Sequence, residues 1–269
     1  MWKMRPLVWA SAGLLPVLAA AAAAMGQVTY TDAQYDQWGD NSADISTVTV
    51  SNDASNLYMT IALNPYSNIG TSGTNSDYYA DYEVGIQTNP STGQTAINTE
   101  YGTGDPTVGN PYGSNIGIST GMNYFIGSYL AGPSYSGGAQ LYSYSSAAGV
   151  GWTQLGSTAS ITEVTGNGSG TGGSLSFAFP LSALGLASGG SFNFDVWTTY
   201  SGGQGAYDAL DNVGTGSATA PYSGASYDSA TAPGSTFAST MYTVSVPEPA
   251  SLGIICACSL LLGTRRRVR

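Results

Sequence analysis

The chain has 269 residues, of which only 8% are charged, and it contains no histidine. A Ser-His-Asp or Cys-His catalytic arrangement and a histidine-ligated metal site are therefore excluded. All 6 basic residues lie before Pro6 or after Thr264, whereas all 16 acidic residues lie between these positions, which gives the interior a formal charge of −16. An interior without a cation excludes nucleic-acid binding by phosphate neutralisation. Its carboxylates favour solubility and can attract divalent cations.

Residues 1–26 have the features of a secretory signal peptide. Lys3 and Arg5 form a positive start, an apolar stretch follows, and small residues crowd its end. Cleavage after Ala24 and cleavage after Gly26 both satisfy the small-x-small rule for signal peptides. We expect the segment to be removed on export. The alternative is a permanent membrane anchor, which the alanine-rich end disfavours.

Residues 27–245 predict an all-β domain, an antiparallel β-sandwich of jelly-roll type with about ten strands. Apolar and polar residues alternate with period two, which places one set on a buried face. A single helical turn is expected at Pro180–Leu184, ended by Gly185. Clusters of Gly, Asn, Ser and Pro separate the expected strands, which are Ile45–Val50, Leu57–Leu63, Tyr82–Ile86, Asn115–Ser119, Tyr124–Leu130, Gln140–Tyr144, Val150–Leu155, Leu175–Phe179, Phe192–Thr198 and Met241–Val246.

The strand at Phe192–Thr198 carries the candidate ligand-binding residues. Its alternation turns Asp195 and Trp197 to the face opposite the core. An exposed indole stacks on sugar rings while a nearby carboxylate binds hydroxyl groups, so Trp197, Asp195 and Tyr207 are the candidates for a carbohydrate site. The alternative is that a second layer or a loop covers this face. Trp152 is expected in the core.

Three groups of acidic residues are candidates for a calcium site, because calcium takes six to eight oxygen ligands from carboxylates, amides and backbone. The leading candidate is Asp208 with Asp211 and Asn212, in a long segment with few core residues. No group matches the EF-hand loop pattern. The other two groups are Asp77, Asp81 and Glu83, and Asp36, Asp40 and Asp44.

Residues 246–269 carry the most specific motif. Pro247, Glu248 and Pro249 precede the apolar run Leu252–Gly263, and a basic tail with Arg265, Arg266 and Arg267 follows. This order resembles the PEP-CTERM sorting signal, on which exosortases of Gram-negative envelopes act. The resemblance implies processing near the Pro-Glu-Pro triplet and delivery to the cell surface or extracellular matrix. The apolar helix is short for a bilayer, which suits a transient transmembrane anchor with its arginines in the cytoplasm.

Two patches of the body share a pattern with a known class of sandwich domains. One patch runs from Val48 to Asp53 and continues into Asn56-Leu57-Tyr58. The other contains Phe179-Pro180-Leu181 and Leu184-Gly185 before the strand that begins at Phe192. These patches are similar to the β-sandwich of family 9 carbohydrate-binding modules. The similarity concerns core and turn residues, so it implies the fold more than the function.

The sequence favours an exported, non-enzymatic surface or matrix protein that binds polysaccharide. A structural acidic matrix protein is the alternative, and a glycoside hydrolase or lyase is a third hypothesis, since 16 acidic residues permit paired carboxylates. The expected partners are an exosortase during export and a polysaccharide. Nucleic acid is not expected as a partner. Contact with the membrane is expected only through the C-terminal helix, before processing. Calcium is the one cofactor expected.

Overall fold

The computed structural model describes residues 26–32, 44–64, 80–93, 116–117, 121–131, 136–147, 150–156, 160–165, 173–200, 208–210, 227–228 and 241–245. All of them belong to one unit of the chain, residues 25–247, while residues 1–24 and 248–269 form a second unit. The sorting signal, and all of the signal peptide except Gly26, lie outside the described residues. Within the described ranges, no helix is long and apolar enough to cross a membrane.

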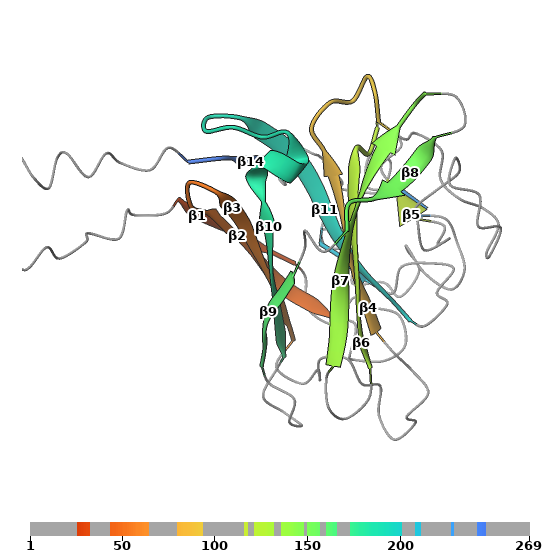
Figure 1. The fold of residues 1–269 in the computed structure, drawn as a ribbon. Coiled ribbons are helices and arrows are strands. Elements are labelled where there is room, and N and C mark those ends of the chain that lie inside the picture. Colours follow the sequence, from red (N-terminus) through yellow and green to blue (C-terminus); the bar gives the residue numbers. More distant parts are fainter. Residues whose placement is uncertain are drawn as a thin grey trace, which may run out of the picture. The chain divides into compact units, whose positions relative to one another are not determined.

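One antiparallel sheet, here called sheet A, has five strands in the order β1-β2-β3-β10-β9. Figure 1 shows it as a separate layer facing the larger sheet. Buried and half-buried residues alternate strictly along β3 and β10, so one face is packed and the other is open to solvent. Its strands are β1 (Gln27–Thr31), β2 (Ile45–Asn52), β3 (Asn56–Leu63), β9 (Ser160–Thr165) and β10 (Ser174–Pro180).

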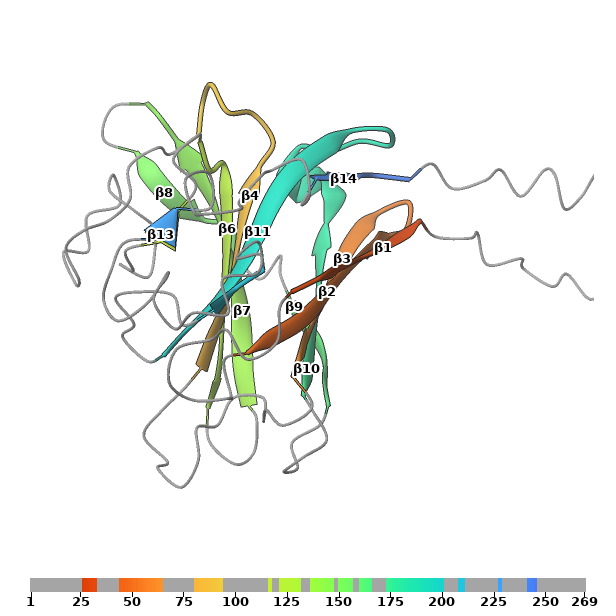
Figure 2. The same cartoon turned by 180° about the vertical axis from the view of Figure 1, so that it is seen from behind.

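The second antiparallel sheet, sheet B, has seven strands in the order β12-β11-β4-β6-β7-β8, with β14 also paired to β11. A short parallel pair, β5 (Ile116–Gly117) with β13 (Tyr227–Asp228), stands apart from both sheets. The view from behind in Figure 2 shows β4, β6, β7 and β11 side by side. The strands of sheet B are β4 (Ala80–Gln87), β6 (Tyr124–Ala131), β7 (Ser136–Ser145), β8 (Gly151–Gln154), β11 (Ser191–Tyr200), β12 (Asp208–Ala209) and β14 (Met241–Thr243).

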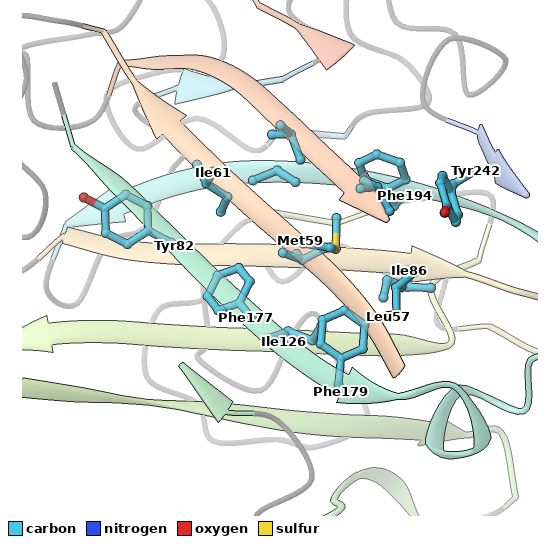
Figure 3. Close-up of a cluster of buried hydrophobic side chains, with 14 of the residues drawn as sticks. Leu57, Met59, Ile61, Tyr82, Ile86, Ile126, Phe177, Phe179, Phe194 and Tyr242 are labelled. Carbon is cyan, nitrogen blue, oxygen red and sulfur yellow. The ribbon is translucent and has the colours of Figure 1, made fainter. Parts of the chain in front are cut away.

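The main core lies between the two sheets. Sheet A contributes Met59 and Phe177, and sheet B contributes Val84 and Phe194, all with no exposed surface. Burial of such side chains stabilises a fold by about 1.5–3 kcal/mol each. Figure 3 shows side chains from β3, β4, β6, β10, β11 and β14 meeting in this layer, namely Leu57, Met59, Ile61, Tyr82, Ile86, Ile126, Phe177, Phe179, Phe194 and Tyr242.

The expected all-β fold of two packed antiparallel sheets is confirmed. The expected helical turn is also confirmed as a 3-10 helix, Leu181–Leu184, and Gly185 ends it with a φ of 64° that favours glycine. The sequence pattern does not predict strands β1, β9, β12 and β13. For β1 the reason is visible, because this strand lies at the edge of sheet A and four of its five residues are exposed.

Candidate functional site

The face of sheet B that points away from the main core, here called the outer face, concentrates aromatic, acidic and amide side chains. Strand pairing aligns Trp197 of β11 with Glu83 of β4, and Asp195 with Gly85. It then aligns Gly85 with Phe125 of β6, and Phe125 with Tyr142 of β7. The residues that share this face are Asp81, Glu83, Gln87, Phe125, Gln140, Tyr142, Tyr144, Trp152, Gln154, Asn193, Asp195, Trp197, Thr199 and Ala209.

A buried contact between Trp197 and Glu83 forms the centre of this face. The indole Nε1 donates a hydrogen bond to Glu83 Oε2 at 2.5 Å, and the Thr199 hydroxyl lies 3.4 Å from Oε1. Trp197 is 0% exposed and Glu83 is 1% exposed. A buried carboxylate needs hydrogen-bond donors of this kind. The donors on β11 therefore hold the Glu83 carboxylate of β4 in place.

The sequence-based expectation that Trp197 and Asp195 lie on an exposed surface is wrong. Both are fully buried, and a second apolar cluster of Met122, Phe125, Trp152, Trp197 and Ala209 lies on this side of the sheet. Asp195 Oδ1 accepts a hydrogen bond of 2.7 Å from the Val196 N–H. Sheet B therefore has buried side chains on both faces, in agreement with the alternative that the face of Trp197 is covered. A role for these residues in sugar binding stays a prediction.

Strands β7 and β8 contribute an accessible part of the outer face, on which Asp81 of β4 and Asn193 of β11 are also only half-buried. Tyr142 and Tyr144 are half-buried, and both pack against the second cluster. The rings of Tyr144 and Trp152 lie 5.3 Å apart at 60°. Gln140 and Gln154 flank them, and Gln140 Oε1 accepts a hydrogen bond of 2.5 Å from the Tyr142 hydroxyl. We call Gln140, Tyr142, Tyr144, Trp152 and Gln154 the aromatic edge.

Sequence analysis did not single out the two tyrosines of the aromatic edge. The signal was present, because Gln140, Tyr142 and Tyr144 alternate with Leu141 and Ser143, and a period of two puts the three polar-tipped side chains on one face. Trp152, expected in the core, is buried in the second cluster at 7% exposure.

Asp81 and Glu83 lie two positions apart on β4 and therefore share the outer face. Burial raises the pKa of Asp81 from 3.8 to about 7, because a desolvated carboxyl group favours its neutral form. Glu83, by contrast, is held by the indole N–H. The two carboxyl groups of this pair therefore lie in different environments.

Of the leading calcium candidate, only Asp208 lies among the described residues. Asp208 in β12 is fully buried, and its Oδ2 accepts a hydrogen bond of 2.5 Å from the Ile45 N–H at the start of β2. Asp44, the residue before Ile45, is also fully buried and accepts a hydrogen bond of 2.8 Å from Asn64 Nδ2. Asp208 therefore connects sheet B to sheet A beside a member of another predicted group. Within the described part of the chain, no three His, Cys, Asp or Glu residues are arranged to hold a metal ion.

Several predicted site residues lie outside the described residues, so no structural statement applies to them. They are Tyr207, Asp211 and Asn212, the acidic residues Asp36, Asp40 and Asp77, and the sorting-signal residues Pro247, Glu248, Pro249, Arg265, Arg266 and Arg267. Comparison with known protein families gives no match for this chain, and no curated protein matches it significantly.

Proposed function

We propose that the protein is an exported surface or matrix component that binds neutral polysaccharide through the aromatic edge of sheet B. The observation that carries the proposal is the grouping of two half-buried tyrosines with Trp152 and two glutamines on β7 and β8. Aromatic rings pack against the apolar faces of sugars, and amide groups bind their hydroxyls. Export is supported by the terminal motifs of the sequence.

Charge indicates the class of polysaccharide. The interior of the chain has 16 acidic residues and no basic residue. An anionic polymer such as a uronate-rich glycan would be repelled by this field at low ionic strength. Uncharged β-glucans, xylans and mannans meet no such barrier, so we expect the ligand among them.

Affinity electrophoresis of the purified protein through gels containing neutral or acidic polysaccharides tests the proposal. We expect slower migration in at least one neutral polysaccharide, and Tyr144→Ala should weaken this retardation at least tenfold in apparent affinity, about 1.4 kcal/mol. Tyr58→Ala is the matched control, since Tyr58 is a half-buried tyrosine on the open face of sheet A. Thermal melts check that both variants are folded. Binding that Tyr144→Ala leaves unchanged would contradict the proposal, as would binding to no neutral glycan.

Glycoside hydrolysis is a second candidate function, favoured by the Asp81 and Glu83 pair. The Cα atoms of residues two apart on a strand are about 6–7 Å apart, which allows their carboxyl groups to adopt the spacing of an acid and base pair that flanks a glycosidic bond. Asp81, with its pKa near 7, would donate a proton to the leaving oxygen. Because Glu83 is 1% exposed, hydrolysis requires that the cover of this face opens; Glu83 would then accept a proton from the attacking water, so that one water molecule is consumed for each bond cleaved.

Release of reducing sugar from the polysaccharides retained in the gels distinguishes binding from hydrolysis. If the pair is catalytic, Asp81→Asn and Glu83→Gln should each abolish turnover while retardation in the gel persists. If the wild-type protein retards and releases no reducing sugar, the hydrolase candidate fails and the binding function stands.

Calcium binding is proposed at the junction of β2 and β12. Asp44 and Asp208 are both fully buried there, in a chain whose interior lacks any basic side chain. A divalent cation bound only by the folded state stabilises it by about 2.7 kcal/mol at a hundredfold excess over Kd. We expect calcium to raise the Tm and sodium at matched ionic strength not to do so. Asp208→Asn should remove the calcium-dependent part of the Tm.

A further inference from the structure

The two ends of the folded body are joined by a hydrogen-bonded cluster that we call the terminal clasp, made of Gly26, Asn52, Tyr242 and Ser245. Gly26 immediately precedes β1, and Ser245 follows β14. The Gly26 N–H donates to Ser245 Oγ at 3.2 Å, and the Tyr242 hydroxyl lies 2.9 Å from the Gly26 carbonyl oxygen. In Figure 1, β1 and β14 lie at the same end of the molecule. The first and last described residues are therefore direct neighbours.

Asn52, at the end of β2, holds the clasp together. Its Oδ1 accepts hydrogen bonds from the Ser245 N–H at 2.8 Å, from Ser245 Oγ at 3.0 Å and from the Tyr242 hydroxyl at 2.8 Å. Its Nδ2 donates to the Ser245 carbonyl oxygen at 3.2 Å. Asn52 and Tyr242 are each only 1% exposed. Buried polar groups of this kind are costly to separate from their partners, so the clasp belongs to the stable fold.

The clasp has no room for a side chain at Gly26, and Gly26 forms hydrogen bonds with the folded domain. A Cβ at this position would lie 2.7 Å from Ser245 Cβ and 3.0 Å from Ser245 Oγ, closer than carbon and oxygen atoms pack. Removal of Gly26 would take one of two acceptors from the Tyr242 hydroxyl, the other being Asn52 Oδ1, and would take the N–H donor from Ser245 Oγ. The folded body therefore includes Gly26, although the sequence rule permits cleavage on either side of it.

We infer that the signal peptide is cleaved after Ala24, so that the mature chain begins at Met25 and retains Gly26 in the clasp. The step is hydrolysis of the Ala24–Met25 peptide bond, in which one water molecule supplies the new carboxyl oxygen and the proton of the new amine. At the other end, Asn52 binds both the N–H and the carbonyl group of Ser245, so a cut in the folded protein falls after Ser245. Both processing positions then lie within a few residues of the Gly26–Ser245 contact. This inference rests on the exported status in the proposed function and is independent of sugar binding.

The first experiment uses the full chain expressed in a bacterium with its export machinery, followed by N-terminal sequencing of the exported protein. We expect Met25 as the first residue. Ala22→Leu changes the −3 position for a cut after Ala24 only, so it should slow cleavage at this bond, and any product that instead begins at Gln27 lacks Gly26 and should have a lower Tm than the wild type. Ala21→Leu is the control, because it occupies neither the −1 nor the −3 position of either candidate cut. Gln27 as the first residue of the exported wild-type protein overturns the inference and leaves export intact.

The second experiment uses Gly26→Ala, which keeps a small residue at a cut after position 26. If Gly26 is retained, the exported variant is heavier than the wild type by one methylene group, and its Tm is lower by several degrees because of the contact with Ser245. Gly138→Ala is the matched control, since a Cβ at Gly138 meets nothing within 4 Å. An exported Gly26→Ala protein with wild-type mass and Tm overturns the inference. A product that begins at Met1 and stays inside the cell contradicts the prediction of a signal peptide, and with it the export part of the proposed function.

Discussion

Residues that point away from the main core differ between the two sheets. On the open face of sheet A they are small and polar, whereas on the outer face of sheet B they include large aromatic and buried acidic side chains. On sheet A, Thr29, Thr49, Thr60 and Ser176 form a row of hydroxyl groups across four paired strands. On sheet B, the corresponding outward positions hold Trp197, Glu83, Phe125 and Trp152, all of them buried. An antiparallel sheet with one solvated face needs only small polar residues there. Large aromatic residues and buried acids at outward positions indicate that something covers them.

The largest expected difference between the two faces comes from removing one aromatic side chain from each. Trp197→Ala should lower the free energy of unfolding by about 3–5 kcal/mol, because it leaves a cavity in a fully buried cluster. Tyr58→Ala on sheet A should cost about 1 kcal/mol, since Tyr58 is half-buried and loses a hydrogen bond of 2.6 Å to Asp53. Urea unfolding of both variants measures the difference. Equal losses would contradict the burial of Trp197 on the outer face of sheet B.

A finer test separates the Trp197 hydrogen bond from the Trp197 packing. Trp197→Phe keeps an aromatic ring but removes the N–H that binds the Glu83 carboxylate at 2.5 Å. We expect a loss of about 1–3 kcal/mol, the cost of removing a donor from a buried acceptor. Glu83→Met in the Trp197→Phe background should recover part of it. Additive losses in this double-mutant cycle would show that the two side chains are not coupled.

The contrast between the faces explains which parts of the molecule could be predicted from sequence. The strands Leu57–Leu63 and Leu175–Phe179 were predicted within a residue at each end, because apolar residues alternate with small polar ones and a single face is buried. The strand Phe192–Thr198 was also predicted, although β11 continues two residues further to Tyr200, but the burial of Trp197 was not predicted. Alternation identifies the two faces and cannot tell whether a second layer covers the polar one. The contact of Asp208 with Ile45 links residues 163 positions apart, and no local pattern contains that information.

The acidic residues of sheet B should make stability depend on pH in a way that sheet A does not. Burial raises the pKa of Asp81 to about 7 from 3.8, so the folded state binds its proton more tightly than the unfolded state does. Below pH 3.8 both states are protonated and Asp81 contributes no difference. As the pH rises from there towards 7, the unfolded state ionises first, and stability falls by at most about 1.4 kcal/mol per pH unit.

The raised pKa of Asp81 makes the free energy of unfolding decrease between pH 4 and pH 7. Asp81→Asn should therefore make this decrease smaller. Urea melts at four or five pH values in this interval measure the slope. Asp53→Asn on the sheet A side is the control, because hydrogen bonds from Tyr58 and the backbone lower the pKa of Asp53, which gives a dependence of opposite sign. An unchanged slope in Asp81→Asn would mean that another group carries the proton.

The smallest expected effect compares one threonine hydroxyl on each face. Thr60 Oγ1 on sheet A lies 2.8 Å from Ser176 Oγ in a half-exposed pair, so water can replace the lost partner in Thr60→Val and the change should stay within about 0.5 kcal/mol. Thr199 on sheet B is 1% exposed, and its hydroxyl faces Glu83 Oε1 at 3.4 Å. Thr199→Val should cost about 1 kcal/mol, because no water replaces a donor to a buried carboxylate. Valine keeps the β-branched shape in both cases, so chemical denaturation of the two variants compares the hydroxyl groups alone. A larger loss for Thr60→Val than for Thr199→Val would mean that the face of sheet A, and not that of sheet B, holds the more important polar contacts.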